Sequence, residues 1–125
     1  MVLDPRVNMK IEIRFKDDVA IVTPSGLLCG GKETDDLERR IRVLAREGNR
    51  KLIVDLRKAA LAGDQPFGVL LRAHFDYVRR HGRMKLCRVG DRDQRFLAAT
   101  RLNQLLDVYR TEDEAVTSFA RELVL

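Results

Sequence analysis

The alternation of polar and apolar residues at the start of the chain predicts a β-hairpin. Residues 10–15 alternate strictly between polar and apolar side chains, which is typical of a strand with one buried face. Residues 16–18 are polar, and residues 19–22 form an uninterrupted apolar run. Two short strands joined by a few polar residues usually pair with each other. We therefore expect the domain to open with an antiparallel pair of strands.

The next segment predicts a helix followed by a central strand. Residues 23–31 are rich in small residues and predict a loop. A helix begins at residue 32 or 33, because an apolar stripe at helical spacing follows, formed by Leu37, Ile41, Leu44 and Ala45. Glycine and asparagine at residues 48–49 mark its end. Residues 52–54 are all apolar, which favours a strand covered on both faces.

A second helix is predicted after a segment without a decisive pattern at residues 57–65. It begins near Pro66, since proline suits the first turn of a helix, and it ends near residues 81–82. Its expected apolar positions are Phe67, Leu70, Leu71 and Val78, with His74 as a further candidate.

The rest of the chain predicts two more strands and two more helices. Residues 84–89 predict a strand, and residues 94–102 predict a helix whose inward side chains are Phe96 and Leu97. Residues 107–110 predict a last short strand. The closing helix begins after Thr111, which forms a capping-box pattern with Glu114.

Most of the predicted strands are followed by helices, which is typical of an α/β fold. We expect a mixed, mostly parallel sheet that opens with the β-hairpin and carries about four helices. The length of 125 residues suits one domain. We expect residues 1–8 to be an irregular lead-in and residues 9–125 to form that single domain.

The basic net charge raises nucleic acid or acidic lipid as a possible partner, but the distribution of the charge argues against nucleic acid. The sequence has 24 Lys and Arg against 19 Asp and Glu, a net charge of +5. Acidic residues are interspersed with the basic ones, and the densest basic stretch, residues 79–95, contains Asp91 and Asp93. No zinc finger, aromatic RNA-binding strip or GxxG loop accompanies it. The pattern predicts a solvated surface.

Hydrophobicity and cysteine usage favour a cytoplasmic protein. The sequence has no run of about 18 apolar residues, so we expect no membrane span. Its first residues lack the apolar region of a signal peptide. The two cysteines, Cys29 and Cys87, lie far apart without a CxxC motif, which favours reduced thiols over a disulfide or a metal pair.

Residues for catalysis are sparse in this sequence. Neither GxGxxG nor GxxxxGK[ST] is present, so the common phosphate-binding loops are missing. His74 and His81 are seven residues apart, too far for an HExxH-type metal pair. Asp55 ends a predicted central strand and is interpreted as a carboxylate that accepts hydrogen bonds from loop amides. We expect no enzyme, metal or cofactor; a nucleotide binder or enzyme using Asp55 and Asp64 is the weaker alternative.

Four short motifs in order suggest a family. They are S-G-L-L at residues 25–28, K-L-I-V-D-L at residues 51–56, G-V-L-L at residues 68–71 and T-E-D-E-A at residues 111–115. Together they make the chain resemble a STAS domain, the fold of bacterial anti-sigma-factor antagonists and of the cytoplasmic domains of sulfate transporters. The order and spacing of the motifs support the resemblance.

The chain departs from this family where switched members are phosphorylated. Those members read D-S-S-G-L-G at the start of the second helix, and a partner kinase phosphorylates the serine after the aspartate. Here residues 63–68 read G-D-Q-P-F-G, so that Gly63 replaces the family aspartate, Asp64 the phosphorylated serine and Pro66 a glycine. Cys29 replaces the aspartate of the family's S-G-x-L-D turn. The resemblance therefore implies a member without phosphorylation at the usual position.

Two interpretations of Asp64 stay open, and both can hold together. A carboxylate before Pro66 can accept hydrogen bonds from free helix amides and cap the helix. It can also be a fixed charge of −1 that partly imitates the family's phosphate, which carries about −1.5 to −2.

The resemblance implies a non-catalytic interaction module in a regulatory circuit. Its partner would be an anti-sigma factor, a kinase of that type or another STAS protein, and a homodimer is also considered. The expected partner-binding residues are Gly63, Asp64, Gln65, Phe67 and Arg72, although helical spacing favours a core position for Phe67. The alternative function is an accessory subunit of a transporter or of a lipid-trafficking ATPase.

Overall fold

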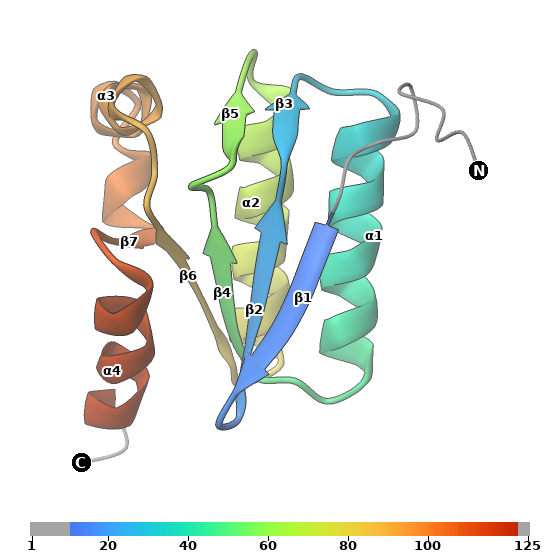
Figure 1. Ribbon diagram of the computed structural model, residues 1–125, viewed down its shortest axis with the longest axis vertical. Helices are drawn as coiled ribbons and strands as arrows, with labels where there is room; N and C mark the ends of the chain where they lie inside the picture. Colours follow the sequence, from blue (N-terminus) through green and yellow to red (C-terminus); the bar gives the residue numbers. More distant parts are fainter. Residues whose placement is uncertain (1–10, 123–125) are drawn as a thin grey trace.

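A five-stranded sheet forms the centre of the fold in the computed structural model, which describes residues 11–122 (Figure 1). The strands, in spatial order, are β1 (Ile11–Lys16), β2 (Val19–Pro24), β4 (Lys51–Asp55), β6 (Arg83–Cys87) and β7 (Asp107–Tyr109). β1 and β2 are antiparallel and the other neighbouring strands are parallel, so the predicted hairpin and mostly parallel sheet are confirmed. The expected lead-in at residues 1–8 lies outside the described residues, and the expected domain bounds, residues 9–125, stay a prediction.

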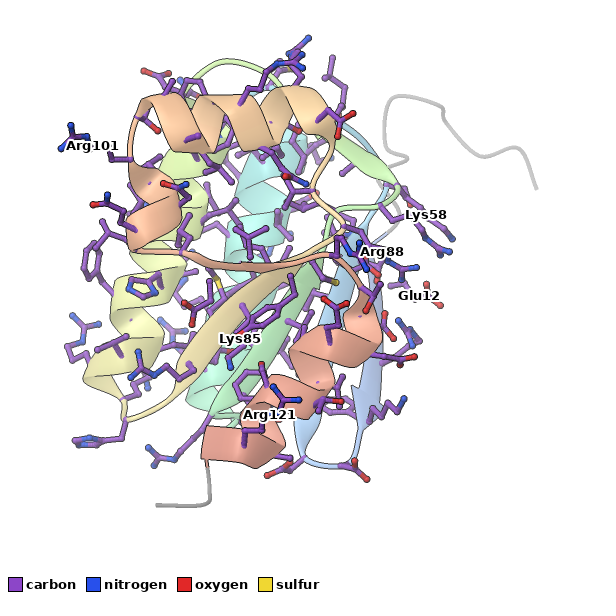
Figure 2. All side chains as sticks on the ribbon, turned by 90° about the vertical axis from the view of Figure 1, so that its left-hand side faces the viewer. Glu12, Lys58, Lys85, Arg88, Arg101 and Arg121 are labelled. Carbon is purple, nitrogen blue, oxygen red and sulfur yellow. The ribbon has the colours of Figure 1, made fainter. Side chains whose placement is uncertain are left out.

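Helices cover both faces of the sheet, in agreement with the predicted α/β class. α1 (Lys32–Arg46) and α2 (Gln65–Arg79) lie side by side on one face, and α4 (Glu112–Glu122) lies on the other (Figures 1 and 2). α3 (Asp91–Ala99) lies at the end of the sheet where α1 and α2 begin, and a short 3-10 helix, Leu102–Gln104, follows it. Within residues 11–122, no helix combines the length and the apolar character needed to cross a membrane.

Two apolar clusters fill the space between the sheet and its helices. The larger cluster lies under α1 and α2 and includes Ala20 and Val22 of β2. The smaller lies under α4 and includes Val19 and Ile21 of the same strand, as the two-residue period of a strand requires. Residues 52–54 of β4 are fully buried and contribute to both clusters. The predicted central strand, covered on both faces, is confirmed.

A second, two-stranded sheet corrects the prediction of a loop before α1 and settles the undecided segment before α2. β3 (Gly26–Leu28) pairs in parallel with β5 (Ala59–Leu61), where we predicted a loop and an undecided segment. Three-residue strands show too little alternation to be recognised, and their pairing joins residues far apart in the chain. This small sheet lies beyond the ends of β2 and β4, near the starts of both helices (Figure 1).

The buried side of α2 differs from the prediction at several positions, since Val69, Ala73 and Tyr77 are buried and Val78 is not. Tyr77 is 1% exposed and belongs to the larger cluster, whereas Val78 is 41% exposed. Tyr77 continues the row of Leu70 and Ala73, while Val78 lies about 100° further around the helix. His74 and Leu71 are half-buried.

α3 begins earlier than predicted, at Asp91. The buried Asp93 carboxylate accepts a hydrogen bond from the Leu61 amide at 3.3 Å, which ties the first turn of α3 to β5. Leu97 faces the core as predicted, but Phe96 stays 36% exposed. The few apolar residues of this segment do not define a helical face, so its boundaries were the least predictable.

Candidate functional site

The predicted partner-binding residues gather at the start of α2. Gly63 and Asp64 are exposed in the turn that joins β5 to α2, Gln65 is exposed as the first residue of α2, and Arg72 is exposed about two helical turns later. Asp64, Gln65 and Arg72 line one shallow hollow of about 390 Å³. These three residues therefore share one surface, and their role in binding a partner stays a prediction.

Phe67 lies beneath this surface rather than on it. Its side chain is 4% exposed, and its ring stacks on that of Phe96 with centroids 4.3 Å apart. The prediction of Phe67 as a partner-binding residue is therefore wrong for direct contact, while the core position favoured by helical spacing is confirmed. Phe67 holds the first turn of α2 against α3.

The first turn of α1 forms the second wall of the hollow, through Thr34 and Asp35, and the connection from β3 holds that turn in place. The Gly30 amide donates a hydrogen bond to Thr34 Oγ1 at 2.8 Å, and Thr34 is 2% exposed. A Cβ atom at Gly30 would lie 2.0 Å from Gln65 Oε1, so this connection touches the start of α2. Gly30 also has a φ of +91°, a conformation that favours glycine. Sequence reasoning missed this wall, because its link to α2 depends on the unpredicted pairing of β3 with β5.

Asp64 occupies the N-cap position of α2, but its carboxylate makes no capping hydrogen bond to the described amides of that helix. Its backbone has φ −92° and ψ −16°, close to helical values, whereas a capping residue is usually extended. The predicted capping bond is therefore absent from this structure. The exposed charge still lies at the positive end of the α2 dipole.

Arg72 connects the hollow to α1. Its Nε and Nη2 donate to the two carboxylate oxygens of Glu38, at 2.6 and 3.3 Å. These hydrogen bonds raise the pKa of Arg72. The Arg72 side chain is still 63% exposed, so it is both paired and accessible to a partner.

Asp55 is buried in a network of charges at the end of β4. The Asp55 side chain is 1% exposed, and its Oδ1 accepts a hydrogen bond from the Arg57 amide at 3.0 Å, which confirms the predicted bond to a loop amide. Arg88 donates to both oxygens of Asp55 and lies 3.4 Å from Glu112 of α4, which also pairs with Arg14 of β1. Burial raises the pKa of Asp55, but the hydrogen bonds from Arg88 and Arg57 outweigh it and hold the pKa below its usual value. The network fits a structural role.

The cysteines are free, as predicted. Cys29 is exposed in the connection between β3 and α1, and Cys87 is buried in β6. Burial raises the pKa of the Cys87 thiol to about 12. In the part of the chain that the structure describes, no cluster of three or more His, Cys, Asp and Glu side chains could hold a metal ion.

Comparison with known proteins agrees with this architecture. The "putative anti-sigma factor antagonist" of Thermotoga maritima superposes with a TM-score of 0.80 at 19% identity, over 86% of this chain and 92% of that one. An anti-sigma factor antagonist from Mycobacterium paratuberculosis gives 0.76 at 20% identity, over 94% and 97%. The Bacillus cell fate determinant SpoIIAA in its phosphorylated form gives 0.69 at 13% identity, over 88% and 99%.

Identities this low show a shared fold. No curated protein matches the chain in sequence. The family model of the STAS domain, however, matches residues 10–115, which include the whole sheet and the first turn of α4. The chain therefore belongs to the STAS domain family.

Proposed function

We propose that this STAS domain is a non-catalytic, cytoplasmic interaction module that acts as an anti-sigma-factor antagonist does, by binding a regulatory protein. The observation that supports this proposal most is the exposed Asp64 carboxylate at the start of α2, which caps no helix amide among the described residues. It is available to a partner at the position where the family resemblance places the phosphorylated serine.

The proposed contact surface consists of Gly63, Asp64, Gln65 and Arg72. The buried Phe67 holds it from beneath, through the stacking of its ring on that of Phe96. A prearranged surface loses little conformational freedom when a partner binds, which favours affinity.

We further propose that no kinase of the anti-sigma type switches this surface. Residues 57–72 contain no Ser, Thr or Tyr. Thr34 lines the hollow, but it is 2% exposed and its hydroxyl already accepts the Gly30 amide. Asp64 would then hold the domain permanently in one binding state.

Phosphate mapping tests this second point. The protein and its Asp64→Ser variant are incubated with a purified anti-sigma kinase and ATP, and phosphopeptides are identified by mass spectrometry. We expect no phosphate on residues 57–72 or on Thr34 of the wild type. Phosphate on residues 57–72 or on Thr34 would contradict the proposal that the domain stays permanently in one binding state.

Partner binding tests the proposal itself. Affinity capture from the native cytosol identifies the stoichiometric partner, and calorimetric titration with that purified partner compares Asp64→Asn with Asp113→Asn. Asp113 is the matched control, because it is an exposed carboxylate in the first turn of α4, on the opposite face of the sheet. We expect Asp64→Asn to change the Kd by about fivefold, the scale of one exposed charged contact, and Asp113→Asn to leave it unchanged.

A captured partner that is neither an anti-sigma factor, nor such a kinase, nor another STAS protein would contradict the proposal. The accessory-subunit function stays a prediction. Permease and ATPase genes beside this one would favour it, whereas a sigma factor or a histidine-kinase-like ATPase gene would favour the function proposed here.

A further inference from the structure

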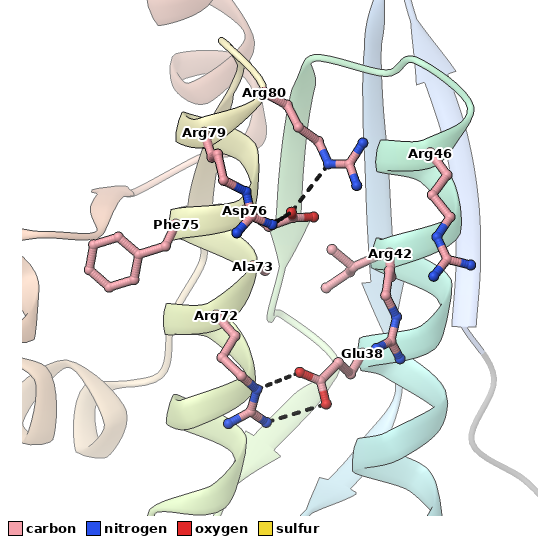
Figure 3. A pocket seen from close by; sticks show the side chains of 10 residues that line it. Glu38, Arg42, Arg46, Arg72, Ala73, Phe75, Asp76, Arg79 and Arg80 are labelled. Atoms are coloured by element: carbon pink, nitrogen blue, oxygen red, sulfur yellow. Dashed lines mark hydrogen bonds and ion pairs between the residues drawn. The ribbon is translucent and has the colours of Figure 1, made fainter.

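A groove of about 500 Å³ runs between the outer sides of α1 and α2, away from the sheet (Figure 3). We call it the arginine groove, because five arginines line it: Arg42, Arg46, Arg72, Arg79 and Arg80. Two carboxylates, Glu38 and Asp76, lie among them, so the formal charge of the groove is +3. Arg72 lines both this groove and the hollow at the start of α2, which makes the two surfaces continuous.

The carboxylates engage only the arginines of α2 and of its C-cap, Arg80. Glu38 pairs with Arg72, and Asp76 accepts from Arg79 at 2.5 Å and from Arg80 at 3.2 Å. Within residues 11–122, no carboxylate pairs with Arg42 or Arg46 of α1. Both of those side chains are exposed, so their guanidinium groups are available to an anion from outside.

The stability of α1 gives only a partial reason for Arg42 and Arg46, because Glu38, one turn before Arg42, directs both carboxylate oxygens to Arg72 of α2. The two arginines of α1 lie four residues apart, one turn along the helix, where two like charges destabilise it slightly. Arg46 is in the last turn and gains from the negative end of the helix dipole. Arg42 lies a full turn earlier, where that gain is small. An external anion would relieve the repulsion between them.

The floor and the surroundings of the groove favour a protein over nucleic acid. Ile41 and Ala73 form an apolar floor, only 2% and 7% exposed, which suits side-chain contacts. Phe75 is 55% exposed on the side of α2 that points away from α1, where a segment crossing α2 would meet it (Figure 3). A duplex carries its phosphates along an extended backbone, and where the groove continues into the hollow it would also meet the carboxylates of Asp35 and Asp64.

We propose that the arginine groove is the docking site for an acidic segment of a protein partner. Carboxylates of the segment would pair with Arg42 and Arg46, while the rest of the segment passes over the apolar floor. The inference rests on the proposed function, because the continuity through Arg72 lets the partner that binds Asp64 extend into the groove. Arginine is suited to this role, since its planar group pairs with carboxylates through two hydrogen bonds.

The test uses a blocked deca-glutamate peptide as the probe and the full chain as the receptor. Binding is followed by amide chemical shifts in NMR, and the affected residues are mapped. We expect shifts on the second half of α1 and on α2 from Arg72 onward. The double variant Arg42→Glu/Arg46→Glu should raise the Kd for the peptide by about tenfold or more, because each change removes an attraction and adds a repulsion.

The matched control is Arg40→Glu/Arg95→Glu. It changes the net charge by the same amount at two exposed arginines outside the groove, so it should leave the affinity for the peptide nearly unchanged. Thermal melting of each variant shows that it is folded, and both substituted positions of each variant are exposed. A fall in affinity as large for the control as for the groove variant would overturn the proposal, because the peptide would then follow net charge alone.

Two other results would also overturn it. One is the absence of peptide binding, and the other is a DNA duplex that shifts the same groove residues at a lower concentration than the peptide. Either result concerns the acidic segment alone. The proposed function is tested separately by Asp64→Asn against the captured partner, so the two failures can be told apart.

Discussion

Single residues show why two similar helix starts in this protein differ. Thr111 precedes α4, and its Oγ1 accepts the Glu114 amide at 3.0 Å, as the capping-box pattern predicts. Asp64 precedes α2 and has an equally suitable side chain, yet it makes no such bond to the described amides. The backbone at Asp64 is near-helical, whereas a residue that caps a helix with its side chain is usually extended. A sequence pattern identifies the residue type at a cap, but the backbone conformation decides whether the bond forms.

This difference predicts that truncating Thr111 lowers the free energy of unfolding more than truncating Asp64 does. Thr111→Ala should lower the free energy of unfolding by about 1 kcal/mol, because a helix amide loses its partner. Asp64→Ala should change it by less than about 0.5 kcal/mol, since it removes only a favourable position near the helix dipole. Urea denaturation of both variants measures the two costs. A larger cost for Asp64→Ala than for Thr111→Ala would mean that Asp64 caps α2 in solution.

Asp55 predicts how stability depends on pH. Its pKa is held below the usual value in the folded protein, so its contribution to stability is complete above the unfolded value of about 3.9 and is lost as the pH falls through the folded pKa. Asp55→Asn should lower the free energy of unfolding at pH 7 by about 2 kcal/mol, because Arg88 loses its charged partner. Denaturation at pH 7 and near pH 3 measures both effects.

The variant also provides the control for the pH effect. Between those two pH values the Asp55→Asn protein should lose less stability than the wild type, because the titrating group is gone. Equal losses would show that other carboxylates dominate the acid sensitivity.

At the scale of the elements, periodic segments could be predicted and short ones could not. The stripe of α1 and the apolar run of β4 were recognised because each has several residues in one pattern. β3 and β5 have three residues each, and only their mutual pairing distinguishes them from loops. In the candidate site, too, residues with a local sequence pattern could be predicted, whereas those placed by long-range strand pairing could not. Asp64 and Gln65 could be identified from the chain, whereas the opposite wall at Thr34 and Asp35 depends on how the pairing of β3 with β5 places the start of α1.

The first turn of α2 predicts a contrast between two phenylalanines of the same helix. Phe67→Ala should lower the free energy of unfolding by about 3 kcal/mol, because it empties a buried position and removes the stacking on Phe96. Phe75→Ala should cost less than about 0.5 kcal/mol, since that ring is 55% exposed. Chemical denaturation compares the two, and similar costs would contradict the assignment of Phe67 to the core.

On the scale of the whole molecule, the central sheet joins two apolar layers into one unit. Charged side chains of the sheet also bind residues of α4. Arg14 of β1 pairs with Glu112 of α4, and Lys85 of β6 donates to Ser118 Oγ of α4 at 2.6 Å. Lys85 lies on the side of the sheet that α4 covers, with its ammonium group 4.3 Å from the centre of the Phe119 ring (Figure 2). These contacts oppose the separation of α4 from the sheet.

This arrangement predicts that the two layers unfold together. The chain has two tyrosines and no tryptophan, and the tyrosines report on different layers: Tyr77 lies in the cluster under α1 and α2, and Tyr109 packs against the cluster under α4. Tyr109→Phe and Tyr77→Phe each leave one tyrosine as the fluorescent reporter. Tyr77→Phe should be mild, because the buried Tyr77 hydroxyl has no hydrogen-bond partner in the described part of the protein. Within each variant, tyrosine fluorescence and circular dichroism should give the same urea midpoint.

A further substitution, Phe119→Ala, is added to each of the two variants. It truncates a 2% exposed ring under α4 and should lower the urea midpoints of both tyrosine reporters equally. If it shifts the midpoint of Tyr109 alone, α4 and the sheet face beneath it unfold as a separate unit, and a partner could then act by releasing that layer.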